Sequence, residues 1–118
     1  MIKIDTDFTI HISRGDAAVI ALIADDGEYE FLPDDVIRFR VYEKNNYTEP
    51  LVEVVETVTE TTTEVDIHLS KENTTIGDDI NKPVTYWYEI SLNETQTIVG
   101  YDEDGAKEFI VYPAEKGE

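Results

Sequence analysis

The chain has 118 residues, 41% hydrophobic and 31% charged, a balance typical of one globular domain spanning residues 1–118. It contains no cysteine, which excludes disulfides and thiolate zinc sites. Its 27 acidic and 9 basic residues give a net charge of −18, so neither nucleic acid nor an anionic membrane is an expected partner. Simple solubility is the favoured interpretation of the acidic surplus, and a cationic partner or bound divalent ions are the alternative.

The chain shows no targeting or membrane signal. The opening residues MIKIDTDFTI carry Asp5 and Asp7 and lack an apolar run, so we expect no secretory signal peptide. No apolar run approaches the roughly 20 residues that a membrane helix needs.

Apolar and polar residues alternate with a period of two through most of the chain, the pattern of half-buried β-strands. The first predicted strand, residues 8–12, places Phe8, Ile10 and Ile12 on one face. The second, residues 17–24, is apolar on both faces, which predicts a central strand. Six more strands are predicted at residues 35–43, 51–59, 63–69, 85–92, 95–101 and 106–112.

Turn residues separate these strands. Asp26-Gly27 and Asp104-Gly105 lie between apolar runs and predict hairpins, and Pro33-Asp34-Asp35 and Asn45-Asn46 predict further turns. Only residues 70–75 favour a helical turn, with Ser70 as its N-cap. The fold class is therefore all-β: an immunoglobulin-like Greek-key sandwich of about eight strands, with a small β-barrel as the alternative.

The residues predict no catalytic group, no metal ligand and no cofactor. Ser13, Ser70 and Ser91 lie in no nucleophile turn, and His11 and His68 fall on the polar phase of their strands. His68 and Asp66 share a strand face, but surface residues are the favoured interpretation. We therefore expect a protein that is not an enzyme, and the sequence assigns no binding residue.

Three short motifs predict turns rather than ligand sites. Residues 101–109 begin like a calcium loop through Asp102, Asp104 and Gly105 but lack the later bidentate glutamate, and residues 24–30 are interpreted in the same way. Arg14-Gly15-Asp16 is an adhesion tripeptide, yet it falls between two predicted strands and consists of natural turn residues. We expect it to be a structural turn.

Two long segments resemble a known family. They are FTIHISRGDAAVIALIADDGEYEFLPDDVIRFRVYEK (residues 8–44) and VTYWYEISLNETQTIVGYDEDGAKEFIVYP (residues 84–113). Their order of strands and turns is similar to the N-terminal immunoglobulin-like domain of phage baseplate upper proteins. Gly15 and Asp16 match a turn of that family, whereas Asp34 stands where a glycine before Asp35 would be more usual.

The resemblance implies a non-enzymatic virion protein of a phage or prophage that docks a peripheral tail component onto the baseplate. Its partners would be other tail or baseplate proteins, and its location would be the virion, after assembly in the bacterial cytoplasm. A homo-oligomer is left open. The alternative function is a carbohydrate- or calcium-binding β-sandwich module, suggested by the tyrosines, Trp87 and the acidic turns.

Overall fold

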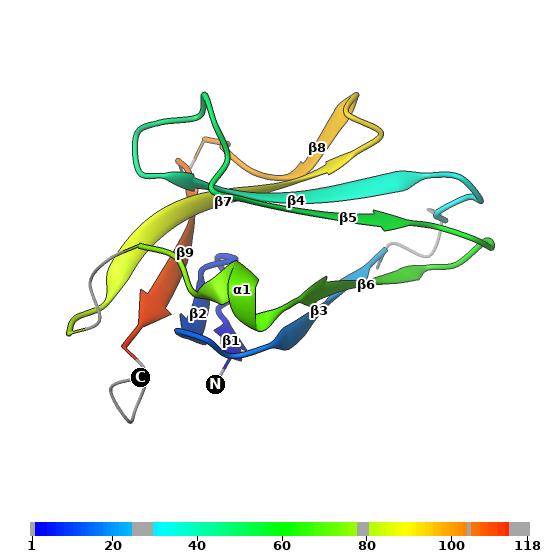
Figure 1. Ribbon diagram of the computed structural model, residues 1–118. Helices are drawn as coiled ribbons and strands as arrows, with labels where there is room; N and C mark the ends of the chain where they lie inside the picture. Colours follow the sequence, from blue (N-terminus) through cyan, green and yellow to red (C-terminus); the bar gives the residue numbers. More distant parts are fainter. Residues whose placement is uncertain (1, 25–29, 78–80, 104, 114–118) are drawn as a thin grey trace.

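The computed structural model describes residues 2–24, 30–77, 81–103 and 105–113, which form nine strands and one short helix (Figure 1). The strands are β1 (Ile2–Ile4), β2 (Ile10–Ser13), β3 (Ala18–Ile23), β4 (Val36–Glu43), β5 (Val52–Thr57), β6 (Glu64–Leu69), β7 (Val84–Leu92), β8 (Gln96–Val99) and β9 (Lys107–Tyr112). The helix is α1 (Lys71–Thr74). Among the described residues, no helix is long and apolar enough to cross a membrane.

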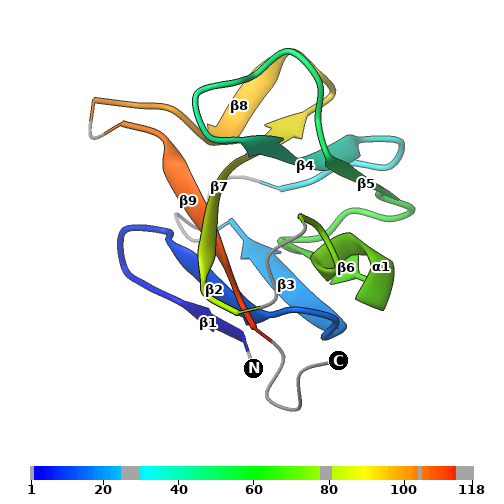
Figure 2. The same ribbon diagram turned by 60° about the vertical axis from the view of Figure 1, so that its left-hand side comes forward.

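The strands form two sheets that face one another (Figures 1 and 2). The larger sheet has the order β1-β2-β9-β7-β4-β5, with β8 also paired to β7, and the smaller sheet pairs β3 with β6. The β2–β9 pair is parallel and the other pairs are antiparallel. The run β9-β7-β4-β5 opposite β3-β6 is consistent with a β-sandwich. The all-β prediction is confirmed.

All eight predicted strand segments contain an observed strand, and the predicted helical turn is α1. Ser70 caps that helix: its hydroxyl accepts from the N–H of Asn73, whose side chain accepts from the N–H of Ser70. The strand that the sequence did not predict is β1, because three residues are too short to show a period of two. The turn predictions at Pro33-Asp34 and Asn45 are also confirmed, and both Asp34 (φ 75°) and Asn45 (φ 67°) adopt the left-handed backbone conformation.

The hairpin predicted between residues 95–101 and 106–112 is wrong. Strand β8 pairs with the end of β7, at Ile90–Leu92, and β9 pairs with its beginning, at Val84–Tyr88. Because β4 occupies the other edge of β7, β8 and β9 lie one after the other along the same edge and run in the same direction. Asp102 and Gly105 form a tight turn between them. Asp104 and the predicted hairpin turn Asp26-Gly27 lie outside the described residues.

The prediction that residues 17–24 form a central strand, buried on both faces, is also wrong. Strand β3 belongs to the two-stranded sheet, and the side chains on its outer face are exposed. Ile20 is buried against the large sheet, whereas Val19 is 51% exposed and Ile23 is 59% exposed. An apolar run on both faces therefore marks an exposed apolar strand here.

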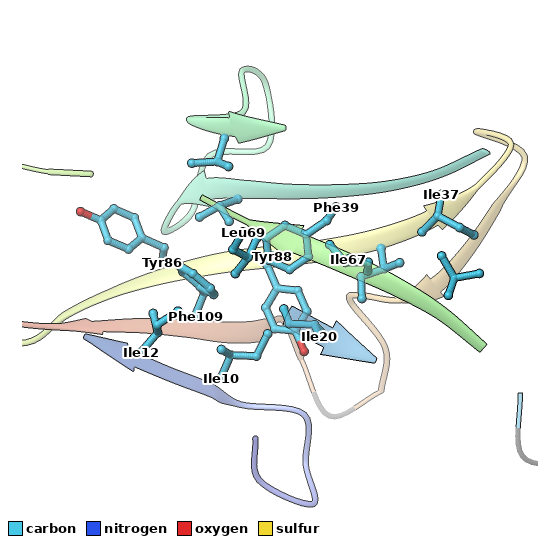
Figure 3. Packing of buried hydrophobic residues seen from close by; sticks show 14 of the residues in the cluster. Ile10, Ile12, Ile20, Ile37, Phe39, Ile67, Leu69, Tyr86, Tyr88 and Phe109 are labelled. Carbon is cyan, nitrogen blue, oxygen red and sulfur yellow. The ribbon is translucent and has the colours of Figure 1, made fainter. Parts of the chain in front are cut away.

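The core lies between the two sheets and is built around three aromatic rings (Figure 3). The ring of Phe39 stacks on Tyr88 at 5.5 Å between centroids and meets the edge of Phe109 at 5.8 Å. The inward residues predicted on four strands are buried: Ile37, Phe39 and Val41; Val65, Ile67 and Leu69; Tyr86, Tyr88, Ile90 and Leu92; and Ile10 and Ile12. Alternation therefore located most of the core.

Replacing Phe39 with alanine should lower the free energy of unfolding by about 3–5 kcal/mol, because a fully buried ring leaves a cavity beside Tyr88 and Phe109. Urea unfolding at pH 7 measures the change. Val55→Ala is the matched control: this side chain on β5 is 46% exposed, and its truncation should cost less than about 1 kcal/mol. Equal losses in the two variants would contradict this location of the core.

Candidate functional site

The Arg14-Gly15-Asp16 segment is a turn between β2 and β3, as predicted. The N–H of Asp16 donates to the carbonyl of Ser13 at 3.1 Å, and Gly15 has a φ of +82°, a conformation that favours glycine. The Arg14 guanidinium donates to the carbonyl of Ile76 at 2.6 Å, and the hydroxyl of Thr74 donates to the carbonyl of Asp16 at 2.8 Å. The tripeptide thus ties the β2–β3 connection to the residues in and after α1.

The two histidines are far from sharing a site. His11, on β2, contacts the hydroxyl of Tyr112 through Nδ1 at 2.8 Å and the carboxylate of Asp5 through Nε2 at 2.7 Å. His68, on β6, lies beside the carboxylate of Glu56 at 3.2 Å. Strands β2 and β6 belong to different sheets, so they do not pair. Among the described residues, no three His, Cys, Asp or Glu side chains are grouped so as to hold a metal ion.

The acidic turn at residues 101–109 is engaged by a lysine. Asp102 accepts from Nζ of Lys107 at 2.8 Å, and only 8% of Lys107 is exposed. A calcium ion at Asp102 would have to displace this buried ammonium group, which is costly because the lysine would lose its charge partner. The other acidic turn, residues 24–30, lies almost entirely outside the described residues.

The aromatic residues that suggested a carbohydrate platform pack against one another. The ring of Tyr47 stacks on Trp87 at 5.2 Å and lies 4.9 Å from Tyr42, on the outer side of the large sheet. Loss of solvent and a hydrogen bond to Glu89 raise the pKa of Tyr42 to about 12. Tyr47 therefore covers a ring face of Trp87, so this face packs against the protein's own side chain.

The most distinctive surface is a groove that the sequence did not reveal. Two hollows, of about 530 and 160 Å³, share Phe8, Asp102 and Lys107 in their walls. We define the Phe8 groove by six lining residues: Asp7, Phe8, Ile98, Tyr101, Asp102 and Lys107. Three of them are exposed apolar or aromatic side chains, since Phe8 is 50%, Ile98 39% and Tyr101 69% exposed. Exposed apolar side chains gathered in one hollow are typical of an interaction surface.

Phe8 is held in an unusual backbone conformation. Its φ is +71°, which L-residues with a bulky side chain rarely adopt. The N–H of Phe8 donates to the carbonyl of Asp5 at 3.0 Å, and the carbonyl of Phe8 accepts from the hydroxyl of Tyr88. The N–H of Thr9 donates to the carboxylate of Asp7 at 3.0 Å. These hydrogen bonds fix a tight turn that displays the Phe8 ring instead of burying it.

Carboxylates dominate the electrostatics of the Phe8 groove. Hydrogen bonds from Thr9, first from its backbone N–H and to a lesser extent from its side chain, hold the pKa of Asp7 below its usual value of 3.8. Asp7 therefore stays charged at neutral pH, and Glu108 adds a further carboxylate to the wall of the larger hollow. The lysine of the groove is bonded to Asp102, so the walls are apolar and acidic.

Alternation placed Phe8 with Ile10 and Ile12 on the buried face, and this prediction is wrong. Ile10 and Ile12 are buried, but β2 begins only at Ile10, and the turn at Asp7-Phe8 rotates the ring outward. The Asp-led turn in TDFT was the available signal, because an aspartate that bonds the N–H two residues later is a common turn device. No protein-family model matches the chain, and no curated protein matches it.

Removing the carboxylate of Asp7 should make the stability of the protein less dependent on acid pH. The pKa of this group is lower in the folded chain, so its stabilisation is present above about pH 4 and is lost as pH falls through the lowered value. The stability difference between the wild type and Asp7→Ala should therefore be largest above about pH 5 and shrink below about pH 3.

Urea unfolding between these pH values measures the difference. Glu49→Ala removes the same charge from an exposed loop and corrects for the general relief of repulsion in a chain of net charge −18. A difference that stays constant across the pH range, after this correction, would show that Asp7 does not hold the turn through its charged form.

Proposed function

We propose that this chain is a non-enzymatic structural domain of a phage or prophage tail, which docks a peripheral component onto the baseplate through protein–protein contacts. The observation that carries the docking function is the Phe8 groove. The link to a phage tail rests on the resemblance of residues 8–44 and 84–113 to baseplate upper proteins.

The exposed position of Phe8 supports a binding function, because holding the ring there lowers the stability of the folded chain. A left-handed conformation costs an L-residue about 1–2 kcal/mol, and strained residues cluster at sites where ligands bind. An aromatic ring left half in water also forgoes part of its hydrophobic stabilisation. Both costs would be offset if the ring is an anchor that a partner covers, since buried aromatic anchors dominate many protein interfaces.

The charge of the groove indicates the chemistry of that partner. Asp7 belongs to the groove, Glu108 lines the larger of its two hollows, and the whole chain carries a net charge of −18. A complementary surface would bring an apolar group to cover Phe8 and Tyr101 and basic groups to meet the carboxylates. We therefore propose a tail protein with a basic, partly apolar docking surface.

Replacing Phe8 with asparagine separates docking from folding. Asparagine accepts the left-handed conformation more readily than phenylalanine, and the ring it replaces is already half exposed. The free energy of unfolding should change by less than about 1 kcal/mol, because relief of strain and loss of apolar contact oppose one another. Incorporation into particles should fall at least tenfold.

The measurement is quantitative mass spectrometry of particles purified from the phage or prophage that encodes the chain. Leu32→Asn is the matched control, because Leu32 is 55% exposed, lies in a loop and lines neither hollow. Consistent absence of the wild-type chain from particles would rule out the tail function. Normal incorporation of Phe8→Asn would show that docking does not use the Phe8 groove.

A further inference from the structure

Strand β3 has an open edge, and the register of the small sheet shows which backbone groups lie along it. In the described part of the chain, β6 is the only strand paired with β3, with Val19 opposite His68, Ala21 opposite Asp66 and Ile23 opposite Glu64. The N–H of His68 donates to the carboxylate of Glu56 at 3.0 Å, so it points away from β3.

The hydrogen bond from His68 to Glu56 shows which residue pairs of β3 and β6 exchange backbone hydrogen bonds. In an antiparallel pair, opposed residues alternate between those that exchange hydrogen bonds and those whose N–H and C=O groups point outward. The Val19–His68 pair exchanges no hydrogen bonds, because the His68 N–H points outward. Since the pattern repeats every two residues, the pairs of Ala21 and Ile23 also have outward-pointing N–H and C=O groups. The backbone N–H and C=O groups of Val19, Ala21 and Ile23 therefore face the open edge.

The other sheet edges carry devices that discourage pairing, and β3 does not. Strands β1 and β8 have only three and four residues, and β5 carries Glu53 and Glu56. The outer edge of β6 is covered by the side chain of Glu56, which bonds its backbone. Short strands and charged side chains are how proteins protect an edge from added strands. Strand β3 has the sequence AVIALI, six residues without a charge, proline or glycine.

We propose that the open edge of β3 binds an extended segment of a partner protein as an added β-strand, and that this segment carries both apolar residues and lysine or arginine on the face that continues the outer face of the small sheet. Backbone hydrogen bonds to Val19, Ala21 and Ile23 would provide affinity, and the exposed side chains of Val19 and Ile23 would select apolar residues beside them. The inference deepens the docking function proposed above and rests on it for the class of partner.

Charge decides between a basic partner and a second copy of this chain. On the outer face of the small sheet, Asp66 and Glu64 lie directly beside Ala21 and Ile23. An added strand would lie two strand spacings, about 10 Å, from these carboxylates, which is close to the screening length in 0.1 M salt. A second copy would bring the same carboxylates and a further charge of −18, whereas lysine or arginine is attracted.

Selection from a displayed library of random twelve-residue peptides on the immobilised full chain tests the proposal. Selected peptides should carry apolar residues and lysine or arginine at every second position, which places them on one face of the added strand, and Ile23→Lys should weaken their binding at least tenfold. A lysine at position 23 lies opposite Glu64 on an exposed face, so the variant should fold. Val55→Lys is the matched control, because it places the same charge on a half-exposed strand position of β5 and should leave binding unchanged.

Amide hydrogen exchange of the complex adds a readout that a general effect on charge would not move. A bound peptide should slow exchange at Val19, Ala21 and Ile23, whose N–H groups face the edge, more than at their neighbours Ile20 and Leu22. Peptides that protect other strands, that bind Ile23→Lys with undiminished affinity, or that are predominantly acidic would overturn the proposal. So would a selection that yields no binder.

Two further outcomes separate this inference from its alternatives. A dimer in sedimentation equilibrium that Ile23→Lys dissolves would assign the edge to a second copy and overturn the proposal of a basic partner. Peptide binding at β3 by a chain that is absent from phage particles would refute the tail function and leave the edge site standing. A chain that is present in particles but binds no peptide at β3 would leave the tail function standing and refute the edge site.

Discussion

The buried hydroxyl of Tyr88 connects the core of this sandwich to its most unusual surface residue. The ring of Tyr88 packs on Phe39 and Phe109, so its hydroxyl needs a partner inside the protein. An unpartnered buried hydroxyl costs about 1–3 kcal/mol, and the carbonyl of Phe8 meets this requirement. Burial raises the pKa of Tyr88, so the hydroxyl keeps its proton and remains a donor at neutral pH. The turn at Phe8 is thus tied to the packing of the core.

The distribution of charge explains why both candidate surfaces favour a basic partner. Several of the few basic side chains are engaged within the chain: Arg40 pairs with Glu53 and Glu94 at 2.6 and 2.7 Å, and Lys107 pairs with Asp102 at 2.8 Å. The Arg14 guanidinium is bonded to the backbone of Ile76. Acids outnumber bases by 27 to 9, so the basic side chains cannot offset most of the carboxylate charge. The chain therefore carries a large excess of negative charge.

The sequence predicted the strands well because a period of two is a local property of each segment. It predicted the inward faces of β4, β6 and β7 for the same reason. It could not predict which strands pair, because pairing depends on contacts between distant residues. The shared edge of β7, where β8 gives way to β9, is such a case. Strand β3 is a second case: its apolar run on both faces indicated a central strand, but the strand lies at an open edge of the small sheet. Phe8 was misplaced because a single left-handed residue reverses the direction of a side chain without disturbing the alternation around it.

Hydrogen exchange in the variant Tyr88→Phe tests the central claim most directly. The change removes one hydroxyl and leaves the aromatic packing against Phe39 and Phe109 in place. The amides of Phe8 and Thr9 are bonded to Asp5 and Asp7. If the Tyr88 hydroxyl holds the Phe8 turn, these two amides should exchange at least tenfold faster in the variant. The amides in the centre of β7 should slow or speed only as much as the change in the free energy of global unfolding requires. Unchanged exchange at Phe8 and Thr9 would show that the turn is fixed without the core, and would contradict this account.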